Sequence, residues 1–249
     1  MSTALPTLPV LNSEWIKIRS LRGTFGALIS VFAVTVGIQV LTASMTGGTE
    51  AGSMGDDPLL AAFYSLNFGQ TAAFAFGATA FSSEFHNGAL RTSLTAVPNR
   101  ARLYLSKLVV VGGLAFLVGQ LTALVTFVAG QAFTGSYALE LGSPGSYRAI
   151  FGCGTYLALM ALLAAGLTAV LRSATVVLSL LIPFTLIVSF VLGAASEGVA
   201  QYLPDRAGQM MMRLDTSTGL APWTGLGVLA LWALVAVIGG WTSVRRRDA

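Results

Sequence analysis

The sequence predicts an all-α polytopic membrane protein, and composition, hydropathy and the arrangement of apolar residues all indicate that fold class. Of the 249 residues, 55% are hydrophobic and only 10% are charged, whereas soluble domains carry about 25% charged residues. The mean hydropathy is +0.77. The apolar residues form long runs that take up more than half of the chain. Because so few charges would not cover a water-facing surface, most of the outer surface must face lipid.

Six of these runs are long enough to cross a bilayer, since a helix of about 20 residues spans a hydrocarbon core about 30 Å thick. Asp57 and Pro58 open the second run with a good N-cap and a proline at the first helical position. The remaining residues are too few for a separate soluble domain, so we expect residues 1–249 to form a single transmembrane domain. The predicted spans are 25–45, 59–81, 108–131, 149–171, 174–195 and 223–244.

The distribution of basic residues predicts the orientation. Eleven of the fourteen Lys and Arg residues fall on one side of the six predicted spans, and seven of the ten acidic residues fall on the other. The basic side is cytoplasmic by the positive-inside rule. We therefore expect a multi-pass protein of the cytoplasmic membrane with both termini in the cytoplasm. Only Arg172 and Ser173 separate the fourth and fifth spans, by either a tight cytoplasmic turn or a longer re-entrant segment.

The segment before the first span is predicted to be an amphipathic helix on the cytoplasmic interface. Apolar and basic side chains recur there at helical spacing, at Leu11, Trp15, Ile18 and Arg22. Asn12 or Ser13 would cap this helix, which serves either as a plain membrane anchor or in a further role. The interfacial residues that we expect are Trp15, Lys17, Arg19 and Arg22.

Two further segments outside the spans are too apolar to be solvated loops. Residues 83–107 combine Phe, Leu and charged side chains in a short helix that is interrupted near Asn87 and ends before Pro98. This segment either docks a protein partner or lies on the lipid surface. The composition of residues 196–221 predicts an interfacial or re-entrant helical hairpin that contains a methionine cluster. The methionine cluster either adapts to apolar ligands or seals the outer end of the bundle.

The chemistry missing from the sequence excludes several kinds of transporter. No predicted span contains an acidic residue, Lys, Arg or His, which argues against proton-coupled carriers, pumps with their own carboxylates and voltage sensors. The only histidine, His86, and the only cysteine, Cys153, have no metal-ligand partners. There is no P-loop, so we predict no enzyme activity of this chain. The basic pI of about 9.6 fits cytoplasmic loops better than nucleic-acid binding.

Polar side chains within the predicted spans are amides and hydroxyls. They either hold helices together or line a substrate path. The amides that are candidates for a translocation path are Gln39, Asn67, Gln70 and Gln120.

Three separated segments of the sequence resemble a known family. The start LNSEWIKIRSLRGTF, the segment 83–107 and the end LAPWTGLGVLALWALVAVIGGWTSVRRRDA are similar to actinobacterial permease subunits of type 2 ABC exporters. The resemblance implies a connecting helix at 9–22, extracellular re-entrant helices at 196–221 and a coupling helix within 84–94 that docks into a separate ATPase. Residues with that coupling role would be Glu84, Phe85, His86, Asn87, Gly88, Leu90 and Arg91, with Glu84 and Arg91 forming salt bridges to the ATPase.

The resemblance also implies a working unit of two permeases, identical or related, and two ATPase subunits that bind ATP and Mg²⁺. This chain would bind no cofactor or metal. Substrates of the broad family include drugs, lipids, peptides and polysaccharides, so multidrug or antibiotic efflux is among the implied functions. Two other classes stay open, namely an ATP-independent channel or facilitator and a non-transporting membrane partner. A neighbouring ATPase gene, or co-purification of an ATPase, would discriminate between these classes.

Overall fold

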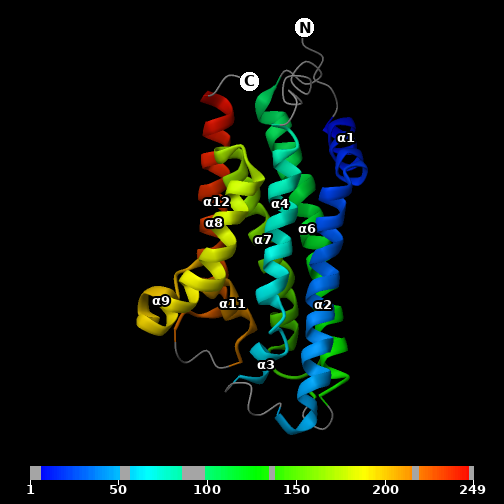
Figure 1. Cartoon of the computed structure of the whole chain (residues 1–249), viewed down its shortest axis with the longest axis vertical. Coiled ribbons are helices and arrows are strands. Elements are labelled where there is room, and N and C mark those ends of the chain that lie inside the picture. Colours follow the sequence, from blue (N-terminus) through cyan, green and yellow to red (C-terminus); the bar gives the residue numbers. More distant parts are fainter. Residues whose placement is uncertain (1–6, 51–56, 86–98, 135–137, 215–218, 247–249) are drawn as a thin grey trace.

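The computed structural model describes residues 7–50, 57–85, 99–134, 138–214 and 219–246, and every regular element within them is helical (Figure 1). This confirms the predicted all-α class. The long helices are α2 (Arg22–Glu50), α6 (Arg100–Gln131), α7 (Ser146–Leu171) and α12 (Pro222–Arg246). The shorter elements are α1 (Thr7–Ser20), α3 (Pro58–Ala61), α4 (Leu66–Ser82), α8 (Ala174–Pro183), a π-helical turn (Phe184–Val188), α9 (Ser189–Ala195), α10 (Glu197–Ala200), α11 (Pro204–Gln209) and a 3₁₀ turn (Met210–Met212).

Five helical segments of the described chain are long and apolar enough to cross a membrane. They are Arg22–Met45, Arg100–Gln131, Ser146–Leu171, Ala174–Ala195 and Pro222–Arg246. Each contains or closely matches one of the six predicted spans. The second predicted span is divided instead into α3 and α4, and α4 by itself has 17 residues.

Gln39 of α2 lies at the break between α3 and α4. Its side-chain oxygen accepts a hydrogen bond from the Ser65 backbone N–H at 3.2 Å, and its side-chain nitrogen donates to the Ala61 carbonyl at 3.3 Å. The first bond gives the Ser65 N–H an acceptor at the break, and the second adds to the bond that the Ala61 carbonyl accepts from the Tyr64 N–H. At the start of α3, the Asp57 carboxylate accepts from the backbone N–H groups of Leu59 and Leu60, which confirms the predicted cap.

α7 is the central helix of the bundle and packs against α4, α6 and α12. In its most apolar stretch 67% of the residues are buried, against 22–33% in the other four spanning segments. Glycines bring its neighbours close. A Cβ at Gly77 would collide with the Ala161 carbonyl, and a Cβ at Gly166 would collide with the backbone of Ala236. Such close backbone approach is typical of helix packing in lipid, where small residues form the interfaces.

The first described helix, α1, and the end of the last, α12, lie at the same end of the bundle, here called the end of the termini, together with the start of α6 and the turn between α7 and α8 (Figure 1). That turn is tight, because α7 ends at Leu171 and α8 begins at Ala174. Arg172 adopts a left-handed conformation with φ 56°, and the Ser173 hydroxyl accepts from the Val176 N–H. Of the two alternatives left open by the sequence, the tight turn is therefore observed.

The structure corrects one detail of the sequence analysis and decides between two interpretations of another. α1 begins at Thr7, so Asn12 and Ser13 lie inside the helix and the predicted cap at those positions is wrong. The methionine cluster, Met210–Met212, is buried against α7 and α12. Its side chains therefore pack the end of the bundle opposite the termini, as the simpler of the two interpretations required.

Candidate functional site

α1 turns one face towards the helix bundle, and that face carries an acidic residue. Glu14 and Ile18, one helical turn apart, are 1% and 3% exposed, and α1 packs mainly on α6. Away from that face Trp15 and Arg19 are exposed, as expected of an interfacial helix, and so is Arg22, the first residue of α2. The fourth predicted interfacial residue, Lys17, is half-buried because its side chain turns inward towards Glu14.

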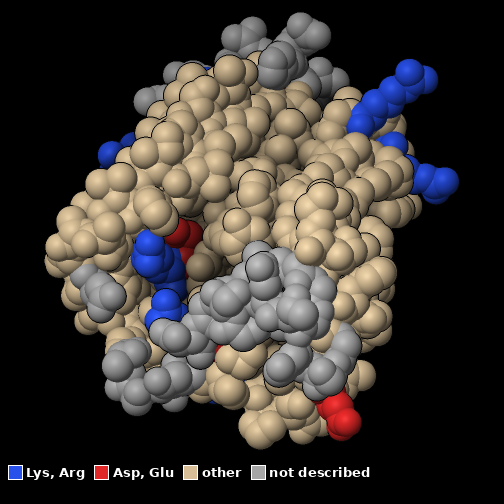
Figure 2. Space-filling view, turned by 60° about the horizontal axis from the view of Figure 1, so that its bottom comes forward, with Lys and Arg blue, Asp and Glu red and all other residues tan. Residues whose placement is uncertain are grey.

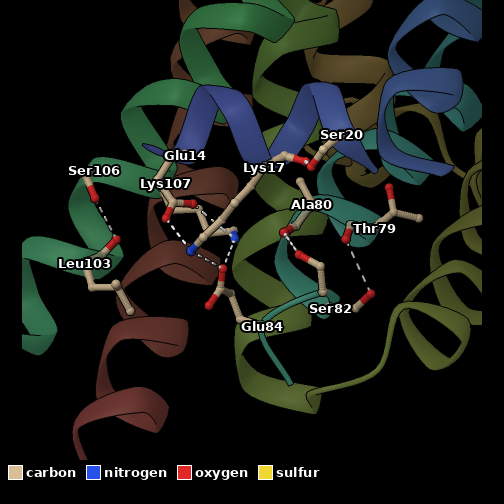
Figure 3. Close-up of polar contacts among 11 residues, drawn as sticks. Glu14, Lys17, Ser20, Thr79, Ala80, Ser82, Glu84, Leu103, Ser106 and Lys107 are labelled. Atoms are coloured by element: carbon tan, nitrogen blue, oxygen red, sulfur yellow. Dashed lines mark hydrogen bonds and ion pairs between the residues drawn. The ribbon is translucent and has the colours of Figure 1, made fainter. Parts of the chain in front are cut away.

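Four charged side chains from three parts of the chain meet beneath α1 and form an ion-pair cluster, defined here as Glu14, Lys17, Glu84 and Lys107 (Figure 3). The Lys107 Nζ lies 2.6 Å from Glu84 Oε1 and 3.3 Å from Glu14 Oε2. The Lys17 Nζ lies 2.8 Å from Glu14 Oε1 and 3.0 Å from Glu84 Oε1. Each ammonium thus contacts both carboxylates, and the cluster has no net formal charge.

Burial makes these contacts stronger than ion pairs on a protein surface. The side chains of Glu14, Glu84 and Lys107 are 2%, 7% and 5% exposed, and only that of Lys17 reaches 37%. Burial acts to raise the pKa of Glu84, but Lys107 and Lys17 outweigh it and hold the pKa at about 2. Burial acts to lower the pKa of Lys17, but Glu14 and Glu84 outweigh it and the pKa is raised. Glu84 and Lys17 are therefore both charged at neutral pH.

Two aromatic rings extend the cluster to neighbouring helices. Lys107 Nζ lies 5.8 Å from the centre of the Phe81 ring near the end of α4, and the Arg172 guanidinium lies 5.6 Å from the centre of the Phe85 ring. Both distances are within the range of cation–π attraction. The chain that leaves α4 is thereby held to α1, to α6 and to the turn between α7 and α8.

The structure describes two of the seven residues that the resemblance places in a coupling helix. Glu84 bonds to two lysines of its own chain, and Phe85 is half-buried against Arg172. The other five lie outside the described residues and are His86, Asn87, Gly88, Leu90 and Arg91.

Glu14 and Lys107 were not singled out from the sequence. A usable signal existed, because Glu14 and Glu84 are two of only three acidic residues on the side of the predicted spans that carries eleven basic residues. Isolated acids among many bases, next to apolar spans, indicate internal ion pairs.

The four amides proposed for a translocation path each bond to a neighbouring part of the bundle. Gln39 closes the break between α3 and α4, Gln70 accepts from the Tyr156 hydroxyl, Asn67 accepts from Gln209 at 3.0 Å, and Gln120 donates to the Phe151 carbonyl at 3.2 Å. These bonds hold helices together. A role of the same amides in a path stays a prediction. Within the described ranges no group of three or more His, Cys, Asp or Glu side chains is placed to hold a metal ion.

Long apolar helices around a central buried helix define a multi-pass membrane protein. Residues 10–196, more than half of the chain, match the model of a family described as ABC-2 family transporter protein, and the chain therefore belongs to that family. No curated protein matches the chain closely. Membership in the family supports a membrane permease of an ABC transporter, a non-enzymatic component that works with an ABC ATPase.

Proposed function

We propose that this chain is the permease subunit of an ATP-driven exporter in the cytoplasmic membrane. Energy would enter through a separate ATPase, because the sequence contains no P-loop and its predicted spans contain no ionisable groups. Family membership supports this proposal, since the chain matches a family of ABC-2 transporters over residues 10–196. The substrate would be a small molecule, lipid or peptide, and multidrug or antibiotic efflux falls within that range.

The proposed topology has six crossings, with α3 and α4 together forming the second. From Pro58 to Ser82 the chain is helical or turned, and i to i−3 backbone hydrogen bonds bridge the break, as from Phe63 to Leu60 and from Leu66 to Phe63. At about 1.5 Å per helical residue, such a segment is long enough for a membrane crossing. With six crossings both termini would lie on one side, and the excess of basic residues there supports a cytoplasmic location of that side.

The single observation that carries the proposed mechanism is the ion-pair cluster. Residues 86–98, which contain most of the proposed coupling helix, connect Glu84 and Phe85 to the start of α6. A force applied to that segment by an ATPase would reach α1 and α6 through Glu84 and Lys107. Glu84 would thus transmit movement inside the permease, while Arg91 and Leu90 would contact the ATPase. This refines the expectation that Glu84 itself forms a salt bridge to the partner.

Two copies of the permease, identical or related, would assemble with two ATPase subunits that bind ATP and Mg²⁺. Large side chains on the outer faces of α2, α8 and α12 are available to lipid or to a second copy, for example Ile29 at 51%, Leu180 at 54% and Leu231 at 58% exposure. α1 would lie at the lipid headgroups as a connecting helix, with Trp15 in the interface.

The proposal is tested by co-expressing the chain with its candidate ATPase and purifying the complex in mild detergent. We expect an ATPase to co-purify, and Arg91→Ala to weaken that association. Glu84→Gln should leave the association largely intact but reduce the ATP hydrolysis that the permease stimulates. Glu140→Gln is the matched control, since Glu140 is exposed and lies outside the ion-pair cluster.

Two results would contradict this assignment. If no ATPase co-purifies under mild conditions, a channel or a non-transporting partner becomes the better assignment. If an ATPase co-purifies, and the complex with the Glu84→Gln permease hydrolyses ATP as fast as the complex with the Glu140→Gln permease, the ion-pair cluster has no part in coupling.

A further inference from the structure

The end of the bundle opposite the termini contains a cavity of about 350 Å³ that is rich in polar groups. Two arginines, Arg206 and Arg213, and two glutamines, Gln201 and Gln209, contribute to its lining. Figure 2 shows a hollow on this face with Lys or Arg side chains on its wall and an Asp or Glu side chain beside them. Only three of the fourteen basic residues belong to this end, Arg148 being the third. Two of the three therefore line one cavity.

Neither cavity arginine forms an ion pair with an acidic residue among the described residues, although burial raises the pKa of the Asp205 carboxyl and the charge of Arg206 acts to lower it. All the ion pairs found among these described residues belong to the cluster at the other end of the bundle. Asp205 precedes Arg206 in the chain but is 5% exposed and lies outside the cavity lining. Two half-buried guanidinium groups line one small space, and the buried Asp205 offsets at most one of these two positive charges, which favours an anion within the cavity.

Backbone contacts hold the arginines in position. Arg206 Nε donates to the Ser189 carbonyl at 3.2 Å, and its guanidinium lies against Gly193, where any Cβ would collide with it. This bond uses one of the five N–H donors of the guanidinium. The Arg213 carbonyl accepts from the Arg148 side chain. The Arg206 side chain and the Arg213 backbone are thus held by contacts that leave most of the guanidinium donors for a ligand.

The two amides of the lining are also held by bonds within the chain. Gln209 Nε2 donates to Asn67 Oδ1 at 3.0 Å, which joins the cavity wall to α4. Gln201 Nε2 donates to the Gly198 carbonyl at 2.9 Å. A wall whose polar groups are fixed before binding loses little conformational entropy when a ligand arrives.

We propose that this cavity binds an anionic group, a phosphate or a carboxylate, at the end of the bundle opposite the termini. Guanidinium forks match the two oxygens of such groups in geometry and charge. The cavity is at the small end of the range for ligand pockets, about 300–1,000 Å³, and so suits a headgroup-sized ligand. The anion is either a free solute or the headgroup of an anionic lipid, which share this chemistry.

The test uses the full chain, purified in an uncharged detergent without any ATPase, so its outcome is independent of the proposed function. Binding is measured by calorimetry with inorganic phosphate, with acetate and with dihexanoyl phosphatidylglycerol, and dihexanoylglycerol serves as the uncharged comparison. We expect at least one anion to bind and dihexanoylglycerol not to bind. Binding of phosphate or acetate as tight as that of the lipid indicates a soluble ligand, whereas binding of the lipid alone indicates a headgroup.

Variants then locate the site. Arg213→Gln should weaken anion binding by about tenfold or more, because charge-assisted hydrogen bonds are lost. Arg213→Lys should recover only part of the affinity, since a lysine has no bidentate fork. Arg245→Gln, on the exposed end of α12, should bind as the unchanged protein does. The proposal is overturned if no anion binds, or if Arg213→Gln binds the anion as tightly as Arg245→Gln.

Discussion

The two ends of the helix bundle use their charged side chains in opposite ways. At the end that carries the termini, two acids and two lysines are buried together and neutralise one another. At the opposite end, Arg206 and Arg213 line a cavity and form no ion pair in the described part of the chain. The first arrangement fixes chain segments to each other, whereas the second leaves charge available for a ligand. We therefore propose that charge at the first end transmits movement within the protein and that charge at the second end binds an anion.

The largest effect that tests this comparison is expected from Lys107→Met. The change leaves two buried carboxylates to share Lys17, and removing one partner from a buried ion pair costs about 3–5 kcal/mol. The loss in free energy of unfolding is measured in mild detergent, with tryptophan fluorescence as the signal for unfolding. The exposed control Arg245→Met should change the free energy of unfolding by no more than about 0.5 kcal/mol. Equal stability of the two variants would mean that the cluster does not hold the chain together.

A smaller loss of stability is expected from a glycine substitution in the helices that connect the two ends of the bundle. Gly77→Ala places a Cβ against the Ala161 carbonyl, and such overpacking costs about 1–3 kcal/mol. The matched control is Gly113→Ala on α6, where a Cβ would meet nothing within 4 Å. There the higher helix propensity of alanine should stabilise the protein by up to about 1 kcal/mol. The free energy of unfolding is measured in the same way. A change of the same sign in both variants would contradict the close contact between α4 and α7.

The double variant Glu84→Gln with Lys107→Met should lose less stability than the sum of the two single changes. Each single change leaves an unequal number of buried charges, whereas the double variant keeps the neutral pair of Glu14 and Lys17. Residues in one ion-pair network usually couple by about 0.5–3 kcal/mol. A double-mutant cycle on unfolding free energies measures this term, and simple additivity would show that Glu84 and Lys107 act independently.

A further effect is expected from pH, with a sign set by the lowered pKa of Glu84. Its stabilising contribution is fully present above the ordinary carboxyl pKa of 4.5 and is lost as the pH falls towards about 2. The unfolding midpoint of the unchanged protein should therefore fall more steeply below pH 4.5 than that of Glu84→Gln. Glu140→Gln should keep the steep dependence. Parallel curves for all three proteins would show that Glu84 is not charged in a buried pair.

Much of the architecture could be predicted from local patterns. Five of the six predicted apolar runs correspond to the five helical segments that are long and apolar enough to cross a membrane. Asp57 and Pro58 correctly predicted the start of α3, because capping depends on adjacent residues. The division of the second run could not be predicted, since it depends on Gln39, which comes from another helix. The burial of the methionine cluster likewise depends on α7 and α12, which are distant in the sequence.

The candidate site was only partly predictable for the same reason. Glu84 and Lys17 were expected to act at the membrane interface or towards a partner, whereas their carboxylate and ammonium groups meet inside the chain. Lys107 directly precedes the third predicted apolar run, and nothing local indicates that it reaches Glu14 of α1. Periodicity identifies faces of helices, but pairing between charges requires the packing of the whole bundle.

The most direct test of the central claim is the rate of ATP hydrolysis by the complete complex that contains the double variant Glu84→Gln with Lys107→Met. This variant keeps a neutral pair within the cluster but lacks the contact between the residues after α4 and α6. We predict unchanged assembly with the ATPase and a loss of about tenfold in permease-stimulated hydrolysis, within the usual range of coupling between sites. Normal assembly together with undiminished hydrolysis would contradict the claim that the ion-pair cluster transmits movement into the bundle.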